Sequence, residues 1–507
     1  MRFRHCAATV IQFSESECQL QVIDELSKSA NFAAHSLRRM EKQITMNWLV
    51  KANVCPGLFY GTHAQDGFLI RIRTPGGLIN SKQGKLLGYL LTEWGGTLQV
   101  TNRANLQIRG VQKPPTSAVF EMLQKLNLAA QNPHIDHLRN IMGSPTAGID
   151  SQELIDTSPL IKALDNLIQN HPLIGELSPK FSIGVDGGGT VGIGIRSPVA
   201  WEHRYNEIQL NAISVDDGNN SINFKLAIAG DKKLYNTQLV ITPEQCLSVV
   251  ATLINVYGEY VRNNPLDTGK KPRMKQLIDH LGLDTYIQQV NSQLTQPLPI
   301  LSAEPTPSQP YHHLGIYPQK NAELCYIGIS LHLGQINAQQ WLGLVELSET
   351  FGNAELRLTP WQTIIMPDIP HQQISQLLPK LSLLGFAEIE SNQVAIAACG
   401  GKPGCAASLT HTQTHASQLA EYLHQRLNLD TPINIHVTGC PKFCAQPSPA
   451  EITLLGHTIN QDGKTIEGYQ VYIGDGEQSL KHKIFEGVFT EIPEFLANFL
   501  TQNRPLN

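Results

Sequence analysis

The 507-residue chain contains few charged residues and no long apolar run. Only 16% of its residues are Asp, Glu, Lys or Arg, below the quarter or so that is usual, and the formal net charge is −5. This balance gives no indication of a nucleic-acid-binding protein. No run of about 18 apolar residues predicts a membrane-spanning helix, and the first 45 residues lack the apolar stretch of a secretory signal. We therefore expect a cytoplasmic monomer that binds neither nucleic acid nor membrane.

The length of the chain predicts two or more domains, because 507 residues exceed what one ordinary hydrophobic core holds. Residues 1–45 fit the rest of the sequence poorly and are expected to be an N-terminal extension. Either this extension is a disordered tail or translation starts at Met46 rather than Met1, and the sequence leaves both alternatives open.

An internal repeat is the most informative feature of the sequence. Gly77–Asn80 matches Gly334–Asn337 at an offset of 257, and Thr101 matches Thr359 at an offset of 258. Each copy alternates apolar and polar residues, continues with a helical pattern (residues 81–94 and 338–351), and then alternates again. This order predicts a strand, a helix and a strand in each copy.

The repeat predicts an α+β chain of two similar halves, each a ferredoxin-like half-domain followed by a larger α/β domain. Between the halves lies LTQPLPILSAEPTPSQP, whose five prolines are typical of an extended linker. The expected parts are the extension (1–45), the first half-domain (46–118), the first α/β domain (119–290), the linker (291–313), the second half-domain (314–390) and the second α/β domain (391–507).

The two copies differ in charge. In the first copy Arg71 and Arg73 are two residues apart, so they are predicted to share one face of a strand. The stretch TNRANLQIRG predicts a second strand, one face of which carries Thr101, Arg103, Asn105, Gln107 and Arg109. Four arginines on adjacent strands favour an anion-binding surface over a merely solvated sheet face. The second copy lacks these charges and has, at the matching positions, Gly328, Ser330, Trp361 and Pro367.

Four of the nine cysteines form two close pairs, and both pairs lie in the second half. Cys399 and Cys405 stand in CGGKPGC, and Cys440 and Cys444 stand in GCPKFC. In a chain of this class they favour metal or redox chemistry over disulfides. The C-x5-C spacing is longer than a zinc knuckle, and the neighbouring glycines leave N–H groups near the sulfurs, so a [4Fe–4S] cluster is favoured over zinc. The isolated cysteines are expected to be buried apolar residues: Cys6, Cys18, Cys55, Cys246 and Cys325.

These motifs resemble those of the sulfite/nitrite reductase superfamily, whose members carry sirohaem and a [4Fe–4S] cluster. The C-x5-C and G-C-x3-C pairs are similar to the cluster motif of that family. RIRTPGGLI, TNRANLQIRG, LRNIMGSPTAG and SPKFSIGVDGG extend the likeness over most of the chain from about residue 48. The resemblance implies a fused pseudo-twofold repeat with a tetrapyrrole on the side of the first α/β domain and the cluster in the second.

The resemblance also implies roles for individual residues. The cysteines Cys399, Cys405, Cys440 and Cys444 would hold the cluster, and Cys444 would bridge to the sirohaem iron. The carboxylates of the tetrapyrrole would be bound by basic side chains, with Asn105 beside them. These are Arg71, Arg73, Arg103, Arg109, Arg139 and Lys180. No catalytic residue is assigned.

Two departures from the reductase pattern point to one branch of the superfamily. Reductases, and sulfite reductases in particular, commonly place a second lysine where this chain has Ser182, and GCPKFC carries Lys442 where reductases typically have asparagine. Both departures resemble precorrin-3B synthase, so we expect O2-dependent hydroxylation and lactonisation of precorrin-3A on the aerobic route to cobalamin. The alternative is a nitrite or sulfite reductase that uses sirohaem and an electron donor such as ferredoxin. A degenerate member that only binds a tetrapyrrole is the third option.

Two further motifs carry weaker signals. His411 and His415 are four residues apart on a predicted helix, and the synthase resemblance leaves room for a non-haem iron there, although incidental surface histidines are favoured. Residues 187–192, GGGTVG, are followed by a predicted strand rather than a helix. We interpret them as a glycine turn in a hairpin and not as a nucleotide site.

Overall fold

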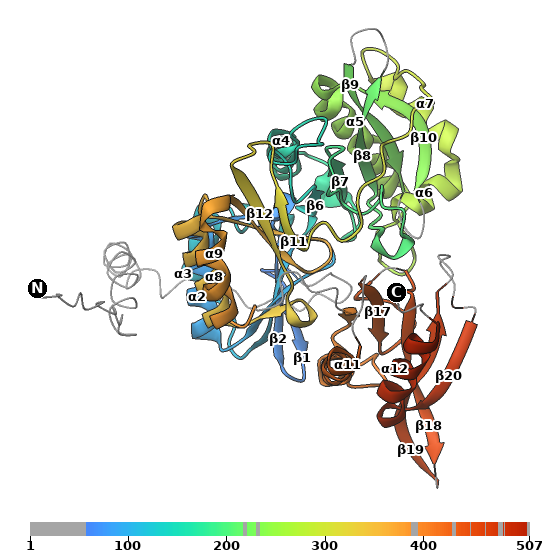
Figure 1. Cartoon of the computed structure of the whole chain (residues 1–507). Coiled ribbons are helices and arrows are strands. Elements are labelled where there is room, and N and C mark those ends of the chain that lie inside the picture. Colours follow the sequence, from blue (N-terminus) through green and yellow to red (C-terminus); the bar gives the residue numbers. More distant parts are fainter. Residues whose placement is uncertain are drawn as a thin grey trace, which may run out of the picture. The chain divides into compact units, whose positions relative to one another are not determined.

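The computed structural model describes residues 57–215, 221–229, 234–386, 394–427, 432–446, 448–461, 463–474, 480 and 482–503 (Figure 1). The expected extension, Met46 and the first three cysteines lie outside these residues. Within the described ranges, no helix has both the length and the apolar character that crossing a membrane requires.

The first ferredoxin-like half-domain is a five-stranded antiparallel sheet with the strand order β1-β2-β5-β4-β13. Its own elements are β1 (Thr62–Ala64), β2 (Gly67–Ile72), β3 (Leu78–Asn80), α2 (Ser81–Trp94), β4 (Thr97–Val100), β5 (Leu106–Val111) and α3 (Ser117–Lys125). Helix α2 begins with a capping box, in which the Asn80 side chain accepts from the N–H of Gln83 and the Gln83 side chain accepts from the N–H of Asn80.

The second half-domain repeats the first, with the strand order β11-β12-β15-β14-β3. Its elements are β11 (Gly315–Pro318), β12 (Leu324–Ile329), β13 (Gln335–Ile336), α8 (Ala338–Phe351), β14 (Glu355–Leu358), β15 (Ile364–Pro370) and α9 (Ile374–Leu383). The capping box recurs with Asn337 and Gln340. Both helices that the repeat predicted are confirmed, and they occupy the expected residues.

The two half-domains exchange a strand. Strand β3 follows the first copy's β2 but pairs with β14 of the second copy, where Ile79 is opposite Leu356. Strand β13 of the second copy pairs in turn with β4, where Ile336 is opposite Leu98. Neither sheet is complete without the other half of the chain, so the half-domains fold as one body.

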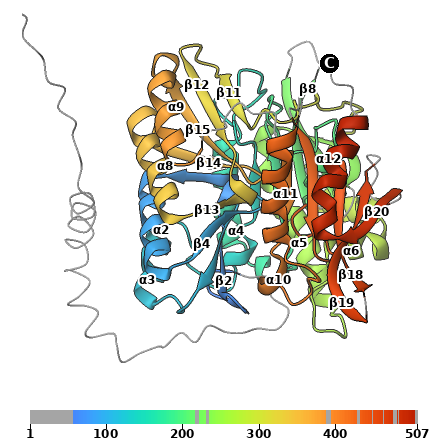
Figure 2. The same ribbon diagram turned by 60° about the horizontal axis from the view of Figure 1, so that its bottom comes forward.

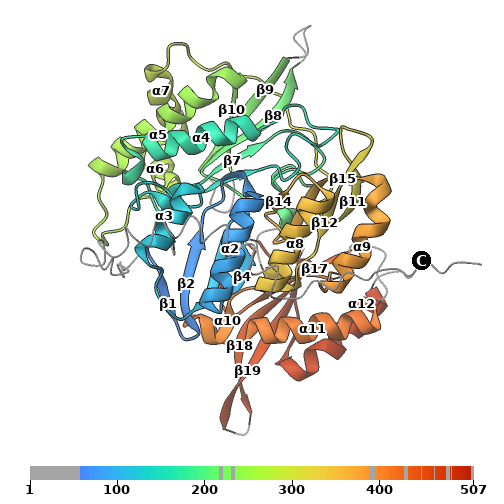
Figure 3. The ribbon, with the colours of Figure 1, turned by 90° about the vertical axis from the view of Figure 1, so that its left-hand side faces the viewer.

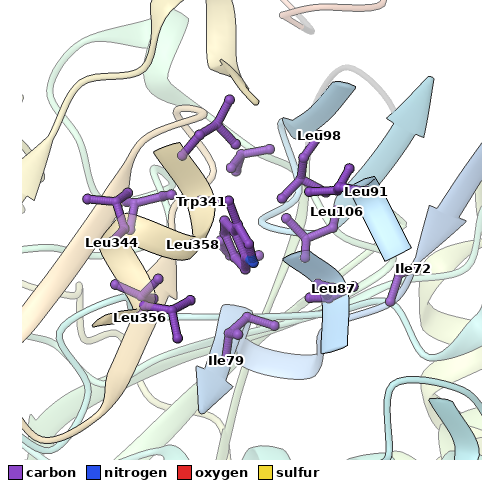
Figure 4. Packing of buried hydrophobic residues seen from close by; sticks show 14 of the residues in the cluster. Ile72, Ile79, Leu87, Leu91, Leu98, Leu106, Trp341, Leu344, Leu356 and Leu358 are labelled. Atoms are coloured by element: carbon purple, nitrogen blue, oxygen red, sulfur yellow. The ribbon is translucent and has the colours of Figure 1, made fainter. Parts of the chain in front are cut away.

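A shared hydrophobic core lies beneath the exchanged strands. Helices α2 and α8 lie side by side on the outer face of the two sheets (Figure 3). The Trp341 ring on α8 is fully buried between them, and its Nε1 donates to the carbonyl of Gly84 on α2 at 2.8 Å. Figure 4 shows the apolar residues around this ring, among them Ile79, Leu87, Leu91, Leu98, Leu106, Leu344, Leu356 and Leu358.

The first α/β domain contains the sheet β10-β9-β8-β7-β6, in which β6, β7 and β8 run parallel and β9 and β10 antiparallel. Its elements are β6 (Ile141–Gly143), α4 (Ser158–Asn170), β7 (Ile183–Asp186), β8 (Ile208–Val215), β9 (Ser221–Ile228), β10 (Tyr235–Ile241), α5 (Cys246–Asn263), α6 (Met274–Leu281) and α7 (Leu283–Gln293). The proline-rich segment follows α7 without helix or strand over residues 301–309, and Leu301 donates its N–H to the Gln238 carbonyl on β10.

The second α/β domain repeats this topology in the sheet β16-β17-β18-β19-β20, again with three parallel and then two antiparallel strands. Helices α11 and α12 pack on one face of the sheet (Figure 2). The elements are β16 (Val394–Ala398), the single turn α10 (Gly401–Gly404), α11 (Thr412–Arg426), β17 (Ile433–Thr438), β18 (Ile452–Gln461), β19 (Lys464–Ile473), β20 (His482–Val488) and α12 (Ile492–Asn503). The predicted α+β pseudo-twofold fold is confirmed.

One predicted strand is wrong in its first half. Residues 101–105 form a tight turn between β4 and β5, with the Ala104 N–H donating to the Thr101 carbonyl and Thr101 N–H to the Asn105 carbonyl. Ala104 has a φ of +52°, which breaks the alternation on which the prediction depended. Arg103 therefore stands on a turn, and only Gln107 and Arg109 of the predicted polar face lie on β5.

Trp341 and Trp361 allow a comparison of how much each tryptophan contributes to the stability of the fold. Trp341 is fully buried at the junction of the half-domains, whereas Trp361 is half-buried and stacks on His313 with ring centroids 4.4 Å apart. We expect Trp341→Ala to lower the free energy of unfolding by about 3–5 kcal/mol, because it opens a cavity and removes the side-chain hydrogen bond to the Gly84 carbonyl. Trp361→Ala should cost clearly less. Equilibrium denaturation of both variants checks this order, and equal losses would contradict it.

Candidate functional site

The paired cysteines lie in two loops at the carboxyl ends of adjacent parallel strands. Cys399 follows β16, Cys440 follows β17, and the two strands pair in register with Ala398 opposite Val437. The backbone ties the loops together, because the Cys399 N–H donates to the Val437 carbonyl and Cys399 Sγ accepts from the Gly439 N–H at 3.3 Å. Side chains at this edge of a parallel sheet converge, as ligand-binding groups commonly do in α/β folds.

The first α/β domain has the same backbone arrangement with a hydroxyl in place of the thiol. Gly143 is opposite Val185 in the equivalent register, so Ser144 occupies the position of Cys399. Its Oγ accepts from the Gly187 N–H at 3.2 Å, as Cys399 Sγ does from Gly439. The repeat therefore includes the scaffold of the cysteine site, and only the second half carries the thiols.

The four thiols are close enough to influence one another. Burial raises the pKa of the Cys444 thiol, although the residue as a whole is exposed, and the charges of Cys399, Cys440 and Cys405 raise this pKa further. Within the described residues, no three His, Cys, Asp or Glu side chains converge as a single metal ion would require. A four-iron cluster has no such requirement, because each thiolate binds a different iron atom. Four cysteine thiols are the ligand set that a [4Fe–4S] cluster takes.

The first half of the chain contacts both cysteine loops. Asn102, on the turn between β4 and β5, donates from Nδ2 to the carbonyl of Cys444 at 3.2 Å. Arg109 on β5 lies against Gly400 and Gly404, which lie between the two cysteines of the first pair. Cationic and thiol groups that are some 300 residues apart in sequence are therefore neighbours in the fold.

Arg103 connects the first half-domain to the first α/β domain. Its Nη1 donates to Asn206 Oδ1 at 2.7 Å and to Ser182 Oγ at 3.1 Å, and its Nη2 donates to the Tyr205 carbonyl at 2.9 Å. Ser182 is the residue at which this chain departs from the two-lysine pattern. Here its hydroxyl accepts from a guanidinium, a role that a lysine could not fill.

Arg71 on β2 lies next to Gln107 on the adjacent strand β5. The two residues are opposite each other in the β2–β5 register, and Arg71 Nη2 donates to Gln107 Oε1 at 2.9 Å. Asn105 is completely buried and is used within the protein. Its Oδ1 accepts from the N–H of Thr74, and its Nδ2 donates to Asn140 Oδ1 at 2.9 Å.

The charges of Arg73 and Arg139 both act on the Asp136 carboxyl group. Burial raises the pKa of this carboxyl group, and the charges of Arg139 and Arg73 oppose the shift. Arg139 is fully buried, with its Nε and Nη2 each 2.8 Å from the carboxylate oxygens of Asp165. Burial alone would lower the pKa of Arg139, but Asp165 raises it above its ordinary value. The Nε and Nη2 of Arg139 are therefore committed to an internal ion pair, and its Nη1 lies 3.9 Å from Oδ1 of Asp136.

Lys180 is exposed and Arg204 is buried. Burial lowers the pKa of Arg204 to about 10, which Glu202 opposes and Arg103 reinforces. Its Nε is buried without a hydrogen-bond partner among the described residues, an arrangement that suits an anionic ligand. The sequence analysis did not identify Arg204 as a site residue, because nothing in its surroundings, HRYNE, distinguishes a buried arginine from a surface one.

The two weaker motifs have local structural roles. His411 Nδ1 lies 2.9 Å from Glu467 Oε2, and His415 Nδ1 lies 2.8 Å from the Tyr469 hydroxyl, so each ring has its own partner on β19. The GGGTVG segment follows β7, and Asp186 accepts from the N–H groups of Gly188 and Ile193. The strand predicted after it is absent from residues 193–198 of the described chain, so the hairpin interpretation is wrong.

Two family models match more than half of the chain. The Nitrite/Sulfite reductase ferredoxin-like half domain matches residues 61–126 and 317–383, and the Nitrite and sulphite reductase 4Fe-4S domain matches residues 134–298. The second match covers the α/β domain without the paired cysteines, to which the cysteine-bearing domain is related by its sheet order and register.

Similar proteins cover nearly the whole chain. A ferredoxin–nitrite reductase of Synechococcus elongatus is 29% identical over 95% of this chain and 94% of its own length. A chloroplastic ferredoxin–nitrite reductase of Zea mays is 28% identical over 89% and 79%. A ferredoxin-type sulfite reductase of Mycolicibacterium paratuberculosis is 27% identical over 81% and 74%. The structure of the Mycobacterium tuberculosis NirA protein superposes with a TM-score of 0.72 at 21% identity, covers 87% of this chain and 82% of that one, and bears on the fold alone.

The prediction of a precorrin-3B synthase is wrong, because these full-length relatives are named nitrite or sulfite reductases. The predictions of precorrin-3A and O2 as reactants and of a role in cobalamin synthesis are therefore not supported either. The prediction gave too much weight to Ser182 and Lys442, since a missing lysine removes one cation without requiring oxygenase chemistry. The chain belongs to the nitrite and sulfite reductase family of oxidoreductases.

Proposed function

We propose that this protein is a ferredoxin-dependent nitrite reductase that holds a [4Fe–4S] cluster and sirohaem. The observation that supports this most is the meeting of the two halves, where Asn102 and Arg109 of the first half touch the loops that carry the four cysteines. The names of the full-length relatives support the donor and the substrate.

The cysteine loops would hold the cluster through Cys399, Cys405, Cys440 and Cys444. When bound, the cluster passes electrons one at a time and the sirohaem supplies the iron at which nitrite is reduced. The Gly439 N–H already donates to Cys399 Sγ, and such a bond stabilises a thiolate ligand. Cys444 is the exposed member of the set, which suits its expected place between the cluster and the ring.

The cationic side chains of the first half would bind the carboxylates of the ring. Arg71, Arg73, Arg103 and Lys180 keep this proposed role, and Arg204 joins them because its buried Nε lacks a partner among the described residues. Asn105 and Arg139 act instead as positioning residues. Asn105 ties Thr74 to Asn140, and Arg139 is bound by Asp165.

Ser182 favours nitrite over sulfite as the substrate. Nitrite carries one negative charge and the sulfite ion two, so a site with one cation fewer loses more affinity for sulfite. The reduction is NO2⁻ + 8 H⁺ + 6 e⁻ → NH4⁺ + 2 H2O, with the electrons supplied singly by reduced ferredoxin.

The proposed reaction is tested by its stoichiometry. Protein purified anaerobically and supplied with photoreduced ferredoxin should form one ammonium ion for every six ferredoxins oxidised, with a higher kcat/KM for nitrite than for sulfite. Nitrite consumption without ammonium, or a preference for sulfite, would contradict the proposed substrate.

Each of the four paired cysteines should be required for the cluster. Cys399→Ser, Cys405→Ser, Cys440→Ser and Cys444→Ser should each remove most of the iron and acid-labile sulfide, because a hydroxyl is a poor iron ligand. Cys55→Ala, Cys246→Ala and Cys325→Ala serve as controls and should retain both. If metal analysis of the parent protein finds zinc and no acid-labile sulfide, the cluster assignment is wrong.

Lys180 and Arg139 should separate ligand binding from stability. Lys180→Gln should weaken sirohaem binding roughly 10-fold and leave the melting temperature unchanged, since it removes one charge-assisted contact from an exposed side chain. Arg139→Gln should lower the free energy of unfolding by about 3–5 kcal/mol, because it leaves Asp165 buried without its partner. Sirohaem titrations and thermal melts on both variants measure these effects. If instead Arg139→Gln weakens sirohaem binding and Lys180→Gln lowers stability, Arg139 binds the ring and Lys180 does not.

A further inference from the structure

Arg109 lies against the backbone of the first cysteine loop, defined here as Cys399–Cys405. On one side, its Nε and Nη2 donate to Oδ2 of Asp66 at 3.2 and 3.1 Å. On the other side, a Cβ atom at Gly400 would lie 2.7 Å from Nη1 of Arg109, and a Cβ atom at Gly404 would collide with Nη2. The guanidinium therefore fills the space that side chains at these two loop positions would need.

The backbone conformation does not explain why these two positions are glycine. Gly400 has φ −58° and ψ −24°, which are ordinary right-handed helical values, and Gly404 has no positive φ. Any residue adopts such conformations. Gly401 differs, because its φ of +58° favours glycine on backbone grounds alone. For each Cβ position at Gly400 and Gly404, the three nearest atoms all belong to Arg109, so contact with the guanidinium is what excludes a side chain.

The first cysteine loop is also fixed within its own domain. Lys402 Nζ lies 2.9 Å from Glu467 Oε1 on β19, and the Lys402 N–H donates to the Thr410 carbonyl. Arg109 thus adds a contact from the other half of the chain to a loop that is otherwise held locally. Its side chain is only 17% exposed, so its charge is less screened than that of a surface arginine.

We propose that Arg109 positions the first cysteine loop and sets the reduction potential of the cluster bound there, rather than binding a carboxylate of the tetrapyrrole. The inference rests on the proposed function, since it requires a cluster at Cys399 and Cys405. Reduction adds one negative charge to the cluster. The Arg109 guanidinium stabilises the reduced form, and the Asp66 carboxylate beside it destabilises that form.

Opposite shifts in potential test this assignment. Arg109→Gln removes the cation and leaves Asp66, so the cluster potential should become more negative. Asp66→Asn leaves the cation without its counter-charge, so the potential should become more positive. Lys113→Gln removes the same charge at an exposed position just beyond β5 and should leave the potential unchanged. The measurement is a redox titration under anaerobic conditions, followed by the EPR signal of the reduced cluster.

A steric variant tests the positioning role without altering any charge. Gly404→Ala should displace Arg109 and accelerate the loss of iron to a chelator several-fold. Gly175→Ala is the matched control, because nothing lies within 4 Å of a Cβ atom at that position. This pair also carries the test if Arg109→Gln fails to accumulate.

The outcomes distinguish this proposal from the proposed function. A parent protein without iron and sulfide would overturn the cluster itself, and the proposal with it. If the parent holds a cluster, unchanged potentials in both Arg109→Gln and Asp66→Asn would overturn the proposal and leave the function intact. Loss of sirohaem from Arg109→Gln at an unchanged potential would likewise refute it and assign Arg109 to the ring.

Discussion

The exchange of β3 and β13 between the half-domains is the interaction on which the candidate site depends. Each strand completes the sheet of the other half, where Ile79 pairs with Leu356 and Ile336 with Leu98. The buried Trp341 ring then fixes α8 against α2 by a hydrogen bond to Gly84. Because the half-domains cannot separate without breaking both sheets, the turn that carries Asn102 and Arg103 is held in place relative to the second half-domain. The hydrogen bond from Asn102 to the Cys444 carbonyl then joins this turn to a cysteine loop. A site built from residues so distant in sequence needs such a constraint.

The two halves share a backbone scaffold but carry different functional side chains. Ser144 and Cys399 occupy equivalent places and accept equivalent N–H bonds, yet only one is a thiol. Conversely, Arg71 corresponds to Gly328, where a side chain would meet the backbone of His313 and Leu314. In the second half-domain, the backbone of His313 and Leu314 therefore covers the position at which the first half-domain carries Arg71. A pseudo-symmetric backbone thus supports an asymmetric site.

Much of the fold could be predicted from the sequence because the repeat is expressed in local patterns. The helices α2 and α8 have a helical pattern and a capping asparagine, and both occupy the predicted residues. The exchanged strands could not be found in this way, since β3 has three residues and β13 two, and their partners are non-local. Residues 101–105 were predicted as part of a strand because their sequence pattern alternates. This segment contains no glycine, so nothing in the sequence indicates the positive φ of Ala104.

The site shows the same division between local and non-local information. The cysteine pairs were identifiable by spacing, since each pair lies within one loop. The roles of the arginines were not, because a guanidinium is equally suited to a ligand carboxylate and to an internal one, such as Asp165 for Arg139 or Asp66 for Arg109. Which partner each arginine has depends on chain segments that only the fold brings together.

The cations of one half and the thiols of the other are proposed to form a single redox site, in which Cys444 would join the ring and the cluster. Mössbauer spectroscopy of the oxidised, ⁵⁷Fe-enriched protein tests this most directly, because an isolated oxidised [4Fe–4S] cluster is diamagnetic. If a ligand is shared, the paramagnetic sirohaem iron should impose magnetic splitting on the cluster irons in an applied field. A diamagnetic cluster beside an independent haem signal would contradict the account.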